Sequence, residues 1–97
     1  MTLKADLMQT REGAIAWYQE EAVLEVNETI CRLMDKKKMT RAELAKAIKM
    51  QPNQFDRFLN GEEILDVRAI AEVLFHLGYK FRMSPLPIHP VPSKEKQ

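Results

Sequence analysis

Apolar residues recur at helical spacing in several stretches of the chain. Between residues 10 and 37 they follow steps of three and four positions: Val23, Val26, Ile30, Leu33 and Met34. Such a stripe predicts one face of an amphipathic helix. The stretch upstream, which contains Trp17 and Tyr18, either continues this helix or forms a separate one. A single helix of about 28 residues would extend beyond its own domain core, so Trp17 would then need another surface, such as a second copy of the chain.

Two short helices in the middle of the chain are framed by strong boundary signals. Thr40 and Glu43 have the spacing of a capping box, which satisfies free N–H groups at the start of a helix. Pro52 suits the first position of the next helix, where an N–H group would have no partner within the helix. Gly61 suits the left-handed position that follows a helix.

The same two helices share a set of apolar positions. These are Leu44, Ile48, Met50, Phe55 and Phe58. Ala45 is small enough to allow the two helices to cross closely. Two short amphipathic helices joined by a tight turn form the arrangement that places the second helix in the major groove of DNA. Residues 40–61 are therefore predicted to form a helix-turn-helix.

One more helix is predicted over residues 66–77, beginning at the N-cap Asp66 and ending before Gly78. Its apolar stripe consists of Ile70, Val73, Leu74 and Leu77. Residues 79–83 then alternate apolar and charged side chains, which predicts a strand. A single strand must find a partner, and the simplest one is the same strand of a second copy. Residues 84–97 contain four prolines and are expected to form a flexible tail.

Positive charge is concentrated in one part of the chain. The 97 residues carry a net charge of +1. Residues 36–61 hold seven basic and two acidic side chains, whereas residues 1–35 hold three basic and seven acidic ones. The three lysines at 36–38 also suit a helix end, where cations interact favourably with the helix dipole. A local basic patch of this size nevertheless attracts a phosphate backbone, whatever the total charge is.

The stretch MTRAELAKAIKMQPNQFDRFLNG, residues 39–61, resembles the Cro/lambda-repressor-like helix-turn-helix proteins of the XRE family. The helix predicted over 66–77 and its terminal Leu-Gly are also similar to that family, so the resemblance covers about residues 39–83. It implies an all-α, lambda-repressor-like domain of four to five helices, which here spans residues 1–83 with the short C-terminal strand. The implied partner is double-stranded DNA, bound in the major groove by a homodimer.

The resemblance also assigns DNA contacts to individual positions. Arg41 stands where the family commonly has a glutamine that touches the phosphate backbone, and arginine binds phosphate at least as well. In the recognition helix, asparagine and glutamine can pair with adenine and arginine with guanine. The full set of candidate DNA contacts is Arg41, Lys49, Gln51, Pro52, Asn53, Gln54, Arg57 and Asn60.

Three residues depart from the family's pattern. Lys49 stands where the turn usually has glycine, and a left-handed backbone there would cost about 1 kcal/mol in strain. Pro52 offers only an apolar ring, suited at best to a thymine methyl group. Asp56 brings a negative charge close to the expected phosphates. A helical hairpin without a DNA role is the alternative interpretation of residues 40–61.

No pattern in the sequence indicates catalysis, a metal site or a cofactor. His76 and His89 are far apart and Cys31 is the single cysteine, so neither a metal-ligand spacing nor an internal disulfide is expected. Glu62 and Glu63 are interpreted as solvated loop residues. No apolar run is long enough to span a membrane. A separate small-molecule domain has no room, and a cytoplasmic location is expected.

Two hypotheses of function follow. The first is a sequence-specific, homodimeric transcriptional regulator of the repressor type. Its dimer contacts are predicted to be Trp17, Tyr79, Phe81 and Met83. The second is an antitoxin similar to the HigA type, which binds a toxin protein through the acidic stretch 12–28 and the proline-rich tail and represses its own operon. A protein-interaction module that has lost DNA reading is a variant of this second hypothesis.

Overall fold

Four helices lie within residues 5, 6 and 8–88, the part of the chain that the computed structural model describes. They are α2 (Arg11–Lys37), α3 (Arg41–Ala47), α4 (Pro52–Leu59) and α5 (Val67–His76). The same residues contain no strand. The prediction of an all-α fold is therefore confirmed, and the helices begin and end close to their predicted bounds.

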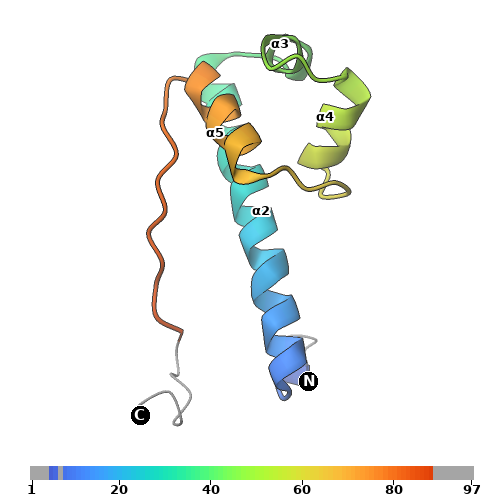
Figure 1. Ribbon diagram of the computed structural model, residues 1–97, viewed down its shortest axis with the longest axis vertical. Coiled ribbons are helices and arrows are strands. Elements are labelled where there is room, and N and C mark those ends of the chain that lie inside the picture. Colours follow the sequence, from blue (N-terminus) through green and yellow to red (C-terminus); the bar gives the residue numbers. More distant parts are fainter. Residues whose placement is uncertain (1–4, 7, 89–97) are drawn as a thin grey trace.

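Helix α2 is one continuous helix, so the stretch around Trp17 extends the predicted helix and does not form a separate one. Thr10 caps its start through a side-chain hydrogen bond. The helix has 27 residues, which corresponds to about 40 Å. Its buried residues, Asn27, Ile30 and Met34, all lie in the second half. Figure 1 shows the first half extending beyond the other helices, as expected for a helix longer than its core.

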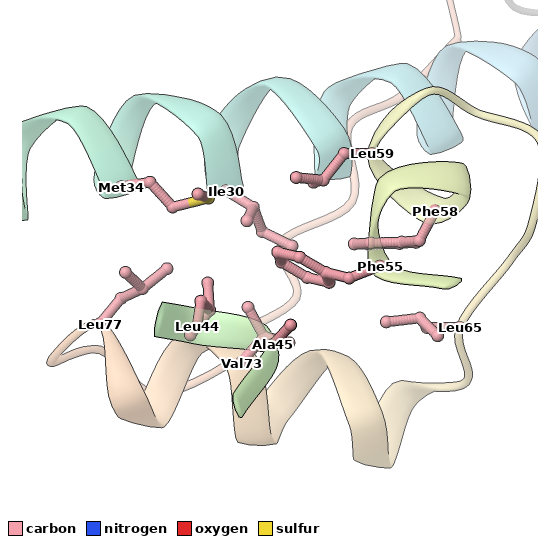
Figure 2. Packing of buried hydrophobic residues seen from close by; sticks show 10 residues of the cluster. All are labelled: Ile30, Met34, Leu44, Ala45, Phe55, Phe58, Leu59, Leu65, Val73 and Leu77. Carbon is pink, nitrogen blue, oxygen red and sulfur yellow. The ribbon is translucent and has the colours of Figure 1, made fainter. Parts of the chain in front are cut away.

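The second half of α2 packs with the three shorter helices around one apolar core. Figure 2 shows side chains from all four helices pointing into the same space. Phe55 on α4, Leu44 on α3 and Val73 on α5 are fully buried, and Ile30 of α2 lies against them. The rest of the core consists of Met34, Ala45, Phe58, Leu59, Leu65 and Leu77. This core fixes the positions of α3 and α4, the two helices predicted to bind DNA.

Each of these four helices ends in the same backbone arrangement. The residues that follow α2, α3, α4 and α5 in the left-handed conformation are Lys38, Lys49, Gly61 and Gly78. In every case the next N–H group donates to a carbonyl five residues earlier, as Met50 does to Ala45 at 2.9 Å. This pattern is the Schellman motif. Glycine signalled two of the four helix ends in the sequence, whereas a left-handed lysine ends the other two.

The strand predicted for residues 79–83 is not formed. These residues follow α5 without helix or strand, and the described residues offer no second strand with which they could pair. Because a strand depends on hydrogen bonds to a neighbour, the alternating pattern alone cannot produce one. In Figure 1 the segment runs back toward the N-terminal end of α2. Residues 84–88 are exposed, and the remainder of the predicted tail, 89–97, lies outside the described residues.

Candidate nucleic-acid interface

The α3–α4 unit begins with the predicted capping box. The Oγ1 atom of Thr40 accepts a hydrogen bond from the backbone N–H of Glu43 at 3.1 Å, and Oε1 of Glu43 accepts one from the N–H of Thr40 at 2.8 Å. Four residues, 48–51, connect the two helices, and Pro52 occupies the start of α4. Ala45 is fully buried, as a close crossing of the helices requires. The predicted scaffold of two helices and a tight turn is therefore confirmed.

Lys49 holds the turn in the left-handed conformation, with φ of 59°. The left-handed backbone on which the expected strain at Lys49 depends is therefore present. Lys38 at the end of α2 has the same φ of 59° and the same motif. Both lysines therefore carry the strain that a β-carbon causes in this conformation.

We expect Lys49→Gly to raise the free energy of unfolding by about 0.5–1 kcal/mol, since relief of left-handed strain exceeds the added freedom of glycine in the unfolded chain. Lys38→Gly is the matched variant and should show the same gain. Urea unfolding followed by circular dichroism measures both values. A loss of stability in either variant would show that the lysine side chain makes a contact more important than the strain.

The predicted DNA-contact residues on α4 lie on the side away from the core. Phe55, Phe58 and Leu59 are buried, whereas Asn53 and Arg57 on the opposite side are exposed. Arg41, Lys49, Gln51, Pro52 and Asn60 are also exposed, and Gln54 is half-buried at the edge. The side chain of Gln51 does not cap α4 and Pro52 has no N–H group, so the N–H groups of Asn53 and Gln54 remain available to a phosphate oxygen.

Arg41 and Asp56 form an ion pair that links the two helices. The Nη1 atom of Arg41 lies 3.2 Å from Oδ1 of Asp56, and both side chains are about half exposed. An exposed pair of this kind contributes little to stability. It does, however, offset the charge of Asp56, which was expected to lie close to the phosphates. Fifteen positions separate the two residues, and no sequence signal connects them.

Glu63 contacts two of the predicted reading residues, so its interpretation as a solvated loop residue is wrong. Its Oε1 atom accepts a hydrogen bond from Nε of Arg57 at 3.1 Å, and its Oε2 atom accepts one from Nε2 of Gln54 at 3.5 Å. The left-handed turn at Gly61 reverses the chain and brings the loop back along α4. An acidic residue two positions after such a glycine is a signal that sequence reasoning could have used.

The predicted dimer residues do not form one cluster within a subunit. Trp17 is half-buried in the first half of α2, whereas Tyr79 follows the end of α5, which lies near Lys37. Twenty residues of α2, about 30 Å of helix, separate Trp17 from Lys37. Tyr79 and Met83 are exposed, and Phe81 is half-buried. Within one subunit these four residues therefore do not form a single contact surface, and a dimer interface that uses all of them would need both copies of the chain.

Helix α3, its turn and the exposed outer side of α4, set on a four-helix core, define the class of helix-turn-helix DNA-binding domains. The family model for the Cro/C1-type helix-turn-helix DNA-binding domain matches residues 29–81, more than half of the chain. The chain belongs to this family, as the resemblance over residues 39–83 predicted. It is a DNA-binding regulator, and DNA is its partner.

No curated protein and no solved structure matches the chain. Within residues 5, 6 and 8–88, no helix has the length and apolar character needed to cross a membrane. The same residues contain no cluster of His, Cys, Asp and Glu that could hold a metal ion.

Proposed function

We propose that this protein is a sequence-specific transcriptional repressor that places α4 in the major groove of its DNA site. The observation that supports this most directly is the outer side of α4, where Asn53 and Arg57 are exposed opposite the buried Phe55 and Phe58. Amide and guanidinium groups are the side chains best suited to bidentate bonds with base edges. The core holds the opposite side of the helix, so these groups are presented on a fixed support.

The candidate contacts divide into two kinds. Arg41 and Lys49 flank α4 and would bind phosphates, which positions the protein without reading sequence. The residues that would face base edges are Gln51, Pro52, Asn53, Gln54, Arg57 and Asn60. Among them Pro52 can offer only apolar contact to a thymine methyl group.

Selection of bound sequences from a random DNA pool at two salt concentrations tests the proposal. We expect one motif to be enriched at both concentrations. We also expect affinity to fall steeply with salt, because each lysine or arginine bound to a phosphate releases counterions. Equal and weak binding to the selected motif and to random DNA would contradict sequence-specific reading.

A homodimer is part of the proposal. Tyr79, Phe81 and Met83 follow α5 in a segment that has no partner element among the described residues, and Met83 is 74% exposed. Apolar side chains on such a segment are suited to contact with a second copy, and Trp17 on the first half of α2 is the fourth proposed contact. Two subunits would then read half-sites about one helical turn apart.

We expect Met83→Lys to shift the protein from dimer toward monomer, because it places a charge in the proposed apolar interface. Ile64→Lys is the matched control, since Ile64 is also 74% exposed but lies in the loop before α5. Sedimentation equilibrium of both variants and the wild type measures the change. A monomeric wild type, or dimers of equal strength in all three proteins, would contradict this interface.

A second candidate function is protein binding of the antitoxin kind, and one observation favours it. The first half of α2 extends beyond the core and exposes Ile15, and Leu24 at the midpoint of the helix is also exposed. The stretch 12–28 also holds five glutamates and no basic residue. An apolar and acidic surface fits a basic protein partner. Co-expression with a small basic protein encoded beside this one tests the idea: a complex that is lost in Leu24→Glu supports it, and the absence of a complex contradicts it.

A further inference from the structure

Glu63, in the loop between α4 and α5, connects two of the proposed reading side chains, Arg57 and Gln54. One carboxylate oxygen accepts from Nε of Arg57 at 3.1 Å, and the other accepts from Nε2 of Gln54 at 3.5 Å. Glu63 is more protected from solvent than Arg57. A single carboxylate therefore bridges two residues that are three positions apart on α4.

The chemistry of the carboxylate fixes how both partners face outward. An ionised carboxylate only accepts hydrogen bonds, so the amide nitrogen of Gln54 must point toward Glu63 and its Oε1 atom away from it. One N–H and the Oε1 acceptor of Gln54 then remain free, which is the pair of groups that adenine requires. For Arg57 the bond at Nε leaves both Nη groups free, and these can donate together to O6 and N7 of guanine.

We propose that Glu63 is a specificity-determining residue, which positions Arg57 and Gln54 for base reading without touching DNA itself. This inference rests on the function proposed above. Without its carboxylate partner, Arg57 would have to lose more side-chain freedom when it binds a base. Ordering a long side chain at an interface costs about 0.5–1.5 kcal/mol, which corresponds to a factor of about 2 to 12 in affinity for the correct site.

A carboxylate beside DNA also repels phosphates, and this effect must be separated from positioning. Repulsion weakens binding to all duplexes by the same factor, because phosphates carry no sequence information. Positioning instead changes the ratio of affinities for the correct and the incorrect base. The pair Arg41–Asp56 supplies a matched control, since it joins another arginine to another carboxylate at 3.2 Å, but on a residue expected to bind phosphate.

The experiment compares five proteins on the duplex selected by the wild type, on its single-base variants and on a random duplex. They are the wild type, Arg57→Ala, Glu63→Gln, Glu63→Asp and Asp56→Asn. We expect Arg57→Ala to erase the preference for guanine at one base pair. Glu63→Gln should reduce discrimination at that same pair about 2- to 12-fold, while binding to random DNA stays equal or rises.

The two remaining variants separate geometry from charge. Glu63→Asp keeps the charge but is too short to reach both partners, so discrimination should fall without a rise in binding to random DNA. Asp56→Asn should raise the affinity for all duplexes equally and leave discrimination unchanged. Urea unfolding of each variant shows whether the fold is retained, and the Asp variant serves if the Gln variant is unfolded.

Two results would overturn the inference, and they differ from each other. If the wild type selects a motif and Arg57→Ala erases one preference, but both Glu63 variants retain it, Glu63 does not position Arg57. If Glu63→Gln raises binding to every duplex by one factor, Glu63 acts only by repulsion. If instead the wild type binds all duplexes alike, the proposed sequence-specific function itself is wrong, and the role of Glu63 falls with it.

Discussion

Phe55→Ala should lower the free energy of unfolding by about 3–5 kcal/mol, the cost of removing a large aromatic side chain from a packed core. Phe55 is fully buried at the point where α4 meets α2, and its ring lies 6.0 Å from that of Phe58. The whole stability of a small domain is only about 5–15 kcal/mol. The variant should therefore unfold at much lower urea concentration, measured by circular dichroism.

Phe75→Ala is the control for this prediction. Phe75 is 72% exposed on α5, so the same chemical change should alter stability by only about 0.5 kcal/mol. Equal losses in the two variants would show that Phe55 is not the centre of the core that holds α4.

Arg57→Ala should weaken binding to the selected DNA site by about 1–3 kcal/mol and relax the preference at one base pair. The guanidinium of Arg57 is exposed on the outer side of α4, and its only ion pair in the described part of the chain uses Nε. Both Nη groups are therefore free for guanine. Fluorescence anisotropy with the selected duplex and its single-base variants measures affinity and preference together.

Arg11→Ala removes the same charge at the far end of α2, remote from α4 (Figure 1). We expect it to change affinity slightly and base preference not at all. If the two variants lose affinity equally and neither alters base preference, Arg57 contributes only charge and does not read the sequence.

The helix-turn-helix was predictable because its helix boundaries depend on residues that are close together in the sequence. The capping box of Thr40 and Glu43, Pro52 at the start of α4 and Gly61 after its end are all local features, and each is found where the sequence placed it. Helix boundaries of this kind depend on hydrogen bonds within a few residues. The apolar spacing then determined which side of each helix enters the core.

Features that depend on distant residues were not predictable in the same way. The ion pair of Arg41 with Asp56 and the contacts of Glu63 arise only when the chain reverses direction. The alternation in residues 79–83 predicted a strand, but a strand needs a partner that the described residues do not supply. Lys38 was interpreted through its charge, at a helix end or within the basic patch, and its place in the left-handed position was not predicted.

We propose that DNA binds to the face formed by α3, the turn and α4. Amide chemical shifts of the labelled protein, followed by NMR during titration with the selected duplex, test this proposal. The predicted result is that the large shifts fall within residues 40–63, with few in the first half of α2. Large shifts confined to residues 12–28, with residues 40–63 unchanged, would contradict the assignment of α4 as the reading helix.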